Sequence, residues 1–399
     1  MNILFVQDVI INPNAGGLER VTYVLSKELA RRGHVINYLC IGRIGEDLLS
    51  KKYTEFKQWS ISLFDKTENV FLTDYRELLI NLKIDIVIFQ DIGNANIRVL
   101  KLTPSNVIKY VVFHNQPFAH LGKEKKIMSL TPFEGLSAKR KLLKLICSFS
   151  PRMYSRLYRD HLSIYYYEIA KHADRFIMLD EKYTDRIIAN SKSLIDIKKI
   201  DAIVNPITFS PNNKTVKKEN IILFVGRLTN PQKNVTGFLD VWSVLRTKLP
   251  HWKAIVLGDG EHREASEAYM RKAKLDNIEF KGNVENIADY YAKSKILCMT
   301  SSYEGWPMVL MEAMSFGCVP VVYDTFEAVH NIVDNGENGL VVPMFETSRM
   351  VEAILSLANE ENVRIKLSVN GKNKLKSFTA EKIVDYWEQR FHEDYWTKN

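Results

Sequence analysis

The chain has 399 residues, of which 46% are hydrophobic and 26% are charged, as in an ordinary globular protein. This composition excludes a disordered, collagenous or coiled-coil chain. At roughly 100–200 residues per domain, the length predicts two or more domains.

The formal net charge of +8 is concentrated in one part of the chain. Residues 121–171 carry eleven Lys and Arg against four acidic residues, and the remainder is almost neutral. Within this stretch, residues 135–159 hold seven Lys and Arg, no acidic residue and many apolar ones, and Arg152, Arg156 and Arg159 share one helical face. This pattern favours binding to an anionic membrane surface. The alternative is a solvated face whose aliphatic stems pack on the domain; no nucleic-acid-binding motif accompanies it, so no nucleic-acid partner is expected.

Four cysteines, at positions 40, 147, 298 and 318, lie far apart without the C-x-x-C spacing of a zinc or redox site. Buried thiols in a reducing compartment are therefore expected. Residues 1–6 lack the basic segment of a signal peptide, and no apolar run reaches the ~18–20 residues that span a bilayer. We expect a cytoplasmic protein, with peripheral attachment to the inner face of the plasma membrane.

In chain order, patterns of buried strands and amphipathic helices alternate from the first residues. Asn2–Gln7 predicts a strand, a polar stretch with Gly16 and Gly17 follows, and residues 18–32 predict a helix that Gly33 ends. Further strands are predicted over residues 35–40, 84–89 and 107–113. This order is typical of a doubly wound parallel sheet.

The alternation starts again after Asn205-Pro206. Strands are predicted over 221–225, 252–257, 296–299 and 319–323, with helices over 234–249, over 261–274 and from near Pro307. A final helix over 381–396 presents Val384, Trp387, Phe391 and Trp396 at helical spacing and has no strand of its own. The predicted α/β architecture is two Rossmann-like, doubly wound domains, over 1–206 and 207–380, that face a central cleft, with residues 381–399 as a helix crossing back to the first domain.

Ligands of open α/β sheets bind at the carboxyl ends of the strands, where helix N-termini also lie. Residues 14–20 have paired glycines there, which let backbone N–H groups approach an anion, although a plain turn explains them as well. The segment is not G-x-G-x-x-G, which argues against a dinucleotide. In residues 226–234, Arg227 leaves a predicted strand and Lys233 precedes a helix. Two such cations suit a diphosphate, and the alternative is a pair of solvated surface cations.

Two glutamates follow the strand predicted over residues 296–299. Glu304 lies in the loop, and Glu312 lies eight residues further on, in an apolar helix that Pro307 opens. At ~100° per residue the two carboxylates would point ~80° apart, so they would address different parts of one elongated ligand. A buried carboxylate needs a partner: the hydroxyl groups of a ribose would serve, and a structural pair with Arg is the alternative.

Taken in order, these segments resemble family 4 glycosyltransferases of the GT-B fold, of the type that builds bacterial capsules, lipopolysaccharide and exopolysaccharide. The shared marks are the glycine-rich turn after the first strand, the Gly-Arg-Leu…Lys-Asn loop that opens the second domain, and two glutamates separated by seven residues. Residues 255–260, 282–285 and 338–343 also match. The resemblance covers essentially the whole chain and is stronger over residues 220–345.

The resemblance implies an acceptor-side N-terminal domain and a C-terminal domain that binds a nucleotide sugar. Arg227 and Lys233 would hold the donor diphosphate, and Glu304 would bind a hydroxyl of the donor sugar. His114 would lie beside the anomeric carbon, although a lone loop histidine is more often a hydrogen-bonded surface residue. The remaining donor contacts would come from Gly16, Gly17, Val284, Pro307, Met308, Val309 and Glu312, with Val284 near the base and Glu312 on the ribose.

The implied reaction transfers a sugar, with retained configuration, from a nucleoside diphosphate sugar to a saccharide or lipid-linked saccharide. By family frequency the donor is a UDP-sugar. No Asp-x-Asp, which holds a metal in many glycosyltransferases, occurs in the sequence. We therefore expect Arg227, Lys233 and a helix N-terminus to stabilise the leaving diphosphate, with no metal and no cofactor. One departure lies at residues 325–331, where many relatives have a Gly-Pro-x-Glu-like segment and this chain has Glu327 and His330, so the donor sugar stays open.

Three other functions remain compatible with the sequence. A sugar-nucleotide epimerase of the GT-B fold would convert the donor without an acceptor. An NAD(P) oxidoreductase would need the G-x-G-x-x-G that is missing. A catalytically silent subunit of polysaccharide assembly would bind a membrane partner without cleaving a donor.

Overall fold

The computed structural model describes residues 1–42, 53–62, 65, 67–90, 93–131, 137–191, 194–209 and 216–398. The chain divides into two compact units. Unit 1 comprises Met1–Pro117, Asp160–Thr208 and Phe378–Asn399, and unit 2 comprises Phe118–Arg159 and Phe209–Ser377. Residues 118–159, which the sequence assigned to the N-terminal domain, thus group with unit 2. The first two residues of the basic segment 135–159 lie outside the described residues.

Unit 1 is built on a parallel sheet with strand order β3-β2-β1-β4-β5-β6-β7. Its strands are β1 (Asn2–Gln7), β2 (Val35–Cys40), β3 (Lys57–Ser60), β4 (Ile86–Phe89), β5 (Ile108–Phe113), β6 (Arg175–Met178) and β7 (Ile200–Ala202). Nearly every residue of the central β1, β4 and β5 is buried, as in strands covered by helices on both faces. The order changes direction between β1 and β4, so the carboxyl ends of these two strands flank the topological switch point.

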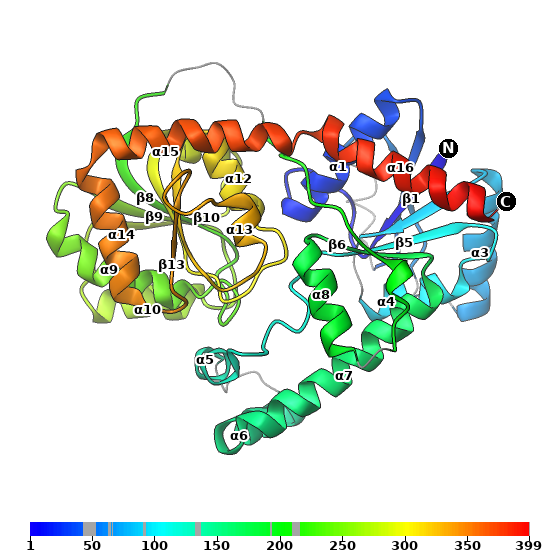
Figure 1. Cartoon of the computed structure of the whole chain (residues 1–399), viewed down its shortest axis with the longest axis horizontal. Coiled ribbons are helices and arrows are strands. Elements are labelled where there is room, and N and C mark those ends of the chain that lie inside the picture. The colour runs from blue at the N-terminus through cyan, green and yellow to red at the C-terminus, as the bar shows by residue number, and fades with distance from the viewer. Residues whose placement is uncertain are drawn as a thin grey trace. The chain divides into compact units, whose positions relative to one another are not determined.

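Helices cover this sheet, and the last helix of the chain is one of them. They are α1 (Gly17–Arg31), α3 (Glu68–Asn81), α4 (Asn94–Leu102), α8 (Glu181–Asn190), the short η1 (Ile197–Lys199), α16 (Ala380–Lys398) and the second half of α7 (Pro151–His172). Figure 1 shows α16 lying along α1, and α16 also contacts β5. The buried rings of Trp387 and Phe391 meet Tyr110 of β5 edge-on, whereas Trp396, expected on the same face, is 78% exposed.

One carboxylate anchors the end of α16 to the sheet. Asp394 accepts hydrogen bonds from the Tyr110 hydroxyl at 2.6 Å and from Nη2 of Arg175 at 2.7 Å. Burial, together with the hydrogen bond to Asp394, raises the pKa of Tyr110, and the hydrogen bond to Asp394 raises the pKa of Arg175. The helix is therefore fixed to unit 1 by an apolar face and by a partly buried charge pair.

Unit 2 is built on a second parallel sheet, with strand order β10-β9-β8-β11-β12-β13. Its strands are β8 (Glu219–Val225), β9 (Lys253–Leu257), β10 (Ile278–Gly282), β11 (Ser294–Met299), β12 (Val319–Tyr323) and β13 (Leu340–Val342). The buried core includes Phe224, Trp242 and Val256. All the strands and helices predicted in both halves lie within two residues of those found.

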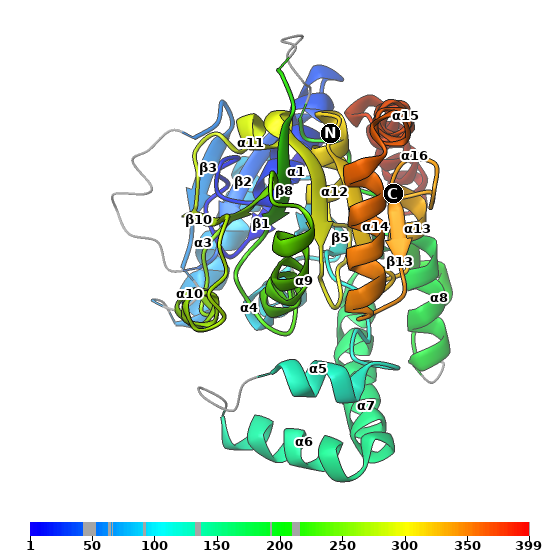
Figure 2. The same ribbon diagram turned by 90° about the vertical axis from the view of Figure 1, so that its left-hand side faces the viewer.

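The helices of unit 2 fall into two groups. Those around the sheet are α9 (Val235–Lys248), α10 (Arg263–Lys272), α11 (Ile287–Lys293), α12 (Met308–Ser315), α13 (Val329–Ile332), α14 (Thr347–Asn359), α15 (Glu361–Lys374) and η2 (Leu375–Ser377). The others form what we call the arm, residues 118–159, with α5 (Glu124–Leu130), α6 (Ala138–Phe149) and the first half of α7. Figure 2 shows α5 and α6 side by side. Among the helices of the described ranges, none has the length and apolar character needed to cross a membrane.

We predict that Asp394→Asn lowers the free energy of unfolding by about 2 kcal/mol, because it leaves Arg175 without its carboxylate partner in a partly buried position. Urea denaturation followed by circular dichroism measures the change. The matched control is Asp385→Asn on the same helix, which breaks a pair with Arg32 whose acidic side chain is 64% exposed and should cost less than about 1 kcal/mol. Equal losses in the two variants would contradict the anchoring role of Asp394.

Candidate functional site

Two loops of unit 2 are locked together where β8 and β9 end. The Gly226 and Leu228 amides donate to the carbonyls of Leu257 and Asp259, at 3.1 and 2.9 Å. Gly258 has a φ of +117°, and a Cβ there would lie 2.1 Å from the Gly226 carbonyl oxygen. Only glycine permits this approach, which explains the glycine at position 258. Arg227 lies between Gly226 and Leu228, whose amides are hydrogen-bonded to the end of β9 and to the loop that follows it. Its backbone is therefore fixed, and the residue is exposed.

Lys233 and Glu304 form an ion pair in this region. The Lys233 ammonium lies 2.6 Å from a carboxylate oxygen of Glu304, and both side chains are largely buried. The two residues come from different strand–helix loops, after β8 and after β11. The structure therefore brings together the cation and the acid that the sequence expected to touch the donor diphosphate and the donor sugar.

Asn234 ties these two loops by its backbone and its side chain. It adopts a left-handed conformation, with a φ of +50°, and its side-chain oxygen accepts from the Gly237 amide to cap α9. Its side-chain amide donates to the Thr300 carbonyl at 3.1 Å, and the Thr300 hydroxyl donates back to the Asn234 carbonyl at 2.9 Å. Lys233 is thus held beside the loop that carries Glu304.

Glu312 is buried in α12 and has a tyrosine partner. The Tyr291 hydroxyl of α11 donates to a Glu312 oxygen at 2.8 Å, and the Tyr291 ring stacks on Phe316. The Tyr291 hydroxyl is thus a partner of this buried carboxylate. Pro307 is the N-cap of α12, one residue before the helix it was expected to begin, and Met308 and Val309 are its first residues. The first amides of a helix have no partner within it, so the start of α12 presents N–H donors.

Two further segments lie at this edge of the unit 2 sheet. The Gly258 amide donates to the Gly282 carbonyl at 2.8 Å, which places the loop of the half-buried Val284 beside the loops after β8 and β9. In residues 325–331, the segment whose sequence differs from that of many relatives, Glu327 is half-buried and His330 is exposed. The His330 Nε2 lies 2.9 Å from a carboxylate oxygen of Asp324.

His114 belongs to unit 1, where it follows β5. Its Nε2 lies 2.7 Å from Oε1 of Gln90, the residue that follows the neighbouring β4. Burial lowers the pKa of His114 to about 3, so the ring is neutral near pH 7. Gly16 and Gly17, also in unit 1, are the N-cap and the first residue of α1, and Gly16 is in extended conformation.

The structure adds partners that the sequence analysis did not single out. The sequence could have indicated Gln90, because it directly follows the strand predicted over residues 84–89. His114 directly follows the strand predicted over residues 107–113 in the same way. Asn234 was also detectable as a capping side chain at a helix start. Tyr291 and Lys123, a buried lysine of the arm, had no local signal: Lys123 donates to the carbonyl of Ser302, 179 residues away in sequence.

The sequence is similar to those of known glycosyltransferases. Residues 207–374 match the family described as Glycosyl transferases group 1. The chain is 25% identical over 384 residues to an uncharacterized glycosyltransferase of Haemophilus influenzae, covering 94% of this chain and 96% of that protein. It is 30% identical over 195 residues to the GalNAc-α-(1→4)-GalNAc-α-(1→3)-diNAcBac-PP-undecaprenol α-1,4-N-acetyl-D-galactosaminyltransferase of Campylobacter jejuni, covering 48% of this chain and 54% of that protein.

A solved structure supports the fold over nearly the whole chain. It is a mutant of TarM from S. aureus, crystallised with fondaparinux, α-GlcNAc-glycerol and UDP. The TM-score is 0.72 at 13% identity, over 97% of this chain and 99% of that one. The chain thus has the GT-B fold of two parallel-sheet α/β units, and its residues 207–374 are similar to group 1 glycosyltransferases.

Proposed function

We propose that the protein is a retaining, metal-independent family 4 enzyme that transfers a hexose-type sugar from a UDP-sugar to a saccharide or lipid-linked saccharide. The main observation in favour is the Lys233–Glu304 ion pair, a partly buried cation and a buried acid from two different strand–helix loops. The name of the Campylobacter relative includes an undecaprenol-linked saccharide, and the TarM mutant was crystallised with UDP. The first supports a lipid-linked saccharide acceptor and the second a UDP-sugar donor. We propose that the enzyme acts in bacterial surface polysaccharide or lipopolysaccharide assembly, including capsule synthesis.

In this proposal unit 2 holds the nucleotide. Arg227 and Lys233 bind the diphosphate, as a planar fork and a point charge. The first amides of α12, at Met308 and Val309 beyond the Pro307 cap, supply further donors. The Glu312 carboxylate accepts from the ribose hydroxyls in place of the Tyr291 hydroxyl that it now binds. These cations and dipoles oppose the charge that develops on the leaving diphosphate.

In the same proposal, the remaining predicted residues contact the base, the sugar and the phosphate of the donor and surround the anomeric carbon. Val284 packs against the base, Glu304 accepts from a sugar hydroxyl, and Gly16 and Gly17 border the phosphate. His114 is neutral and directs its Nε2 to Gln90, so its Nδ1 remains as an acceptor for a hydroxyl beside the anomeric carbon.

The chemical step needs no enzymatic nucleophile. The acceptor oxygen attacks the anomeric carbon from the face that the diphosphate leaves, and the bond from that carbon to the diphosphate oxygen breaks. Its electron pair stays on the diphosphate, which takes the proton of the acceptor hydroxyl. The protein positions both reactants and stabilises charge, and the configuration is retained.

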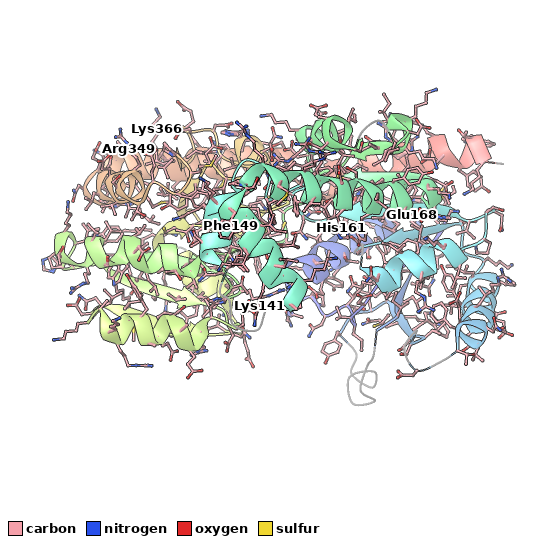
Figure 3. The ribbon with its side chains drawn as sticks, turned by 90° about the horizontal axis from the view of Figure 1, so that it is seen from below. Lys141, Phe149, His161, Glu168, Arg349 and Lys366 are labelled. Carbon is pink, nitrogen blue, oxygen red and sulfur yellow. The ribbon has the colours of Figure 1, made fainter. Side chains whose placement is uncertain are left out.

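We also propose that the protein is cytoplasmic and attaches by its arm to an anionic membrane surface, where a lipid-linked acceptor is presented. Exposed cations flank exposed apolar side chains on α6 and the start of α7: Lys139, Arg140, Lys141, Arg152, Arg156 and Arg159 around Leu142, Leu145, Phe149, Met153 and Leu157. Phe149 is 87% exposed, and Figure 3 shows it with Lys141 on α6. Lys144 differs from its neighbours, because it donates to the Thr131 carbonyl and burial lowers its pKa.

We predict that Lys233→Ala weakens UDP binding by roughly 10- to 100-fold, because a charge-assisted hydrogen bond contributes about 1.5–3 kcal/mol. Glu312→Ala should have a similar effect through the ribose. Titration calorimetry with UDP, GDP and ADP measures both. The control is Lys248→Ala, exposed at the opposite end of α9, which should bind as the wild type does. A wild-type protein that binds no nucleoside diphosphate, or variants that bind unchanged, would refute the proposed donor site.

For Glu304→Gln we expect UDP affinity to stay within about threefold while hydrolysis of the UDP-sugar slows by on the order of 100-fold, since the lost contact is to the sugar and strengthens in the transition state. Chromatography of the released sugar and UDP follows the reaction. The control is Glu327→Gln, at a half-buried acid of residues 325–331. It tests whether loss of another carboxylate slows hydrolysis of the UDP-sugar to the same extent. Conversion of the donor without release of UDP would instead indicate an epimerase.

Neutralising Lys139, Arg140 and Lys141 together to Gln should reduce binding to anionic liposomes by roughly 100-fold at low salt, at about 1 kcal/mol for each cation. Phe149→Ser should reduce it by roughly tenfold, through the loss of a buried aromatic ring. Co-sedimentation with phosphatidylglycerol vesicles measures both, and UDP binding should not change. The matched control neutralises Arg349, Lys366 and Lys376, exposed cations outside the arm, two of which are labelled in Figure 3. Equal losses in that control would show that net charge alone is responsible.

A further inference from the structure

The arm contacts the sheet of unit 2 through a buried lysine. Lys123 is the N-cap residue of α5, and only 8% of it is exposed. Its ammonium donates to the backbone carbonyl of Ser302 at 2.6 Å and also to that of Thr325. A lysine on a protein surface is normally solvated, and burial of an ammonium requires partners that replace its water. The two carbonyls supply this replacement.

The first of these two carbonyls belongs to the loop that carries Glu304, the proposed donor-sugar contact. Ser302 follows β11 and lies two residues before Glu304, and Thr325 follows β12. The loops are also bonded to each other, because the Thr325 hydroxyl donates to the Ser301 carbonyl at 2.6 Å. The Ser302 amide donates to the Gln232 carbonyl at 2.7 Å, next to Lys233. One ammonium thus bridges a three-loop network that contains the Lys233–Glu304 pair.

Aromatic rings of the arm hold the same loop beside Lys123. His120 stacks on Tyr158 at 4.6 Å between ring centroids, its Nδ1 lies 2.7 Å from the Tyr154 hydroxyl, and it meets the Tyr303 ring at 5.8 Å. Burial lowers the pKa of His120 to about 4, so this ring is neutral near pH 7 and packs as an aromatic group. Tyr303 lies between Ser302 and Glu304, so the arm contacts the loop through a main-chain carbonyl and through the adjacent side chain.

We propose that Lys123 is a positioning residue for sugar transfer: its ammonium fixes the Ser302 and Thr325 carbonyls and so holds Glu304 against the donor sugar. This inference rests on the proposed donor site. Lys123 acts through the backbone and does not touch the diphosphate, which Arg227 and Lys233 bind. Its loss therefore affects the reaction of the sugar more than the affinity for the nucleotide. A displacement of even about 1 Å at a reacting group can cost up to 100-fold in rate.

The test compares Lys123→Met, Lys123→Gln and Lys123→Arg with the wild type. The probes are UDP for binding and UDP-glucose, UDP-galactose and their N-acetylamino counterparts for hydrolysis. For Lys123→Met we expect the kcat of hydrolysis to fall at least about tenfold while the Kd for UDP stays within about threefold. Lys123→Arg keeps a charged donor and should recover most of the kcat. Lys125→Met, at an exposed lysine of the same helix, should match the wild type.

The outcomes separate this inference from the proposed function. If the wild type binds no UDP and hydrolyses none of the four donors, the proposed function fails, and the inference fails with it. If the wild type is active and Lys123→Met keeps its full kcat, only the positioning role fails. Lys123→Gln serves where the Met variant does not fold. Equal losses of thermal stability, UDP affinity and kcat in all three variants would assign Lys123 to stability alone and overturn the proposal.

Discussion

All strands within each sheet run in the same direction, and the position of every candidate residue depends on this constraint. Parallel strands place their carboxyl ends, and the N-termini of the following helices, at one edge of the sheet. Residues that are far apart in the chain, such as Arg227, Glu304 and Thr325, therefore follow the neighbouring strands β8, β11 and β12 of unit 2. In unit 1, Gln90 and His114 follow adjacent strands for the same reason.

Burial of charge is the second condition that shapes the site. A carboxylate or ammonium removed from water needs hydrogen-bonding partners, and each buried group here has one. Lys233 and Glu304 pair with each other, Glu312 accepts from Tyr291, and Lys123 donates to two carbonyls. In the proposed function, a nucleotide sugar that binds at Lys233, Glu304 and Glu312 exchanges one set of partners for another, so much of the desolvation cost is met before the ligand arrives.

The charge excess of the chain belongs to a separate surface. Most of it lies on the arm, whose outer helices present cations and apolar side chains together. The inner side of the arm uses its polar groups differently: Lys123, His120 and Lys144 are tied to the body of unit 2 or to the arm itself. The basic segment thus has two faces, and the exposed cations and apolar side chains lie together on the outer one.

The sequence by itself determined the α/β class, the order of the elements and the loops in which Arg227, Lys233, Glu304 and Glu312 lie. These are local properties, set by hydrophobic period, glycine and proline positions and helix starts. The basic segment was also visible, although the assignment of residues 118–159 to unit 2 was not. Tertiary structure alone decided which side chains meet. The Lys123–Ser302 and Tyr291–Glu312 contacts join segments with no local pattern in common, because the first arises from packing of the arm on the loop after β11 and the second from packing of α11 on α12. Trp396 stays exposed while Trp387 and Phe391 are buried against β5, because at ~100° per residue it lies about 140° around α16 from Phe391.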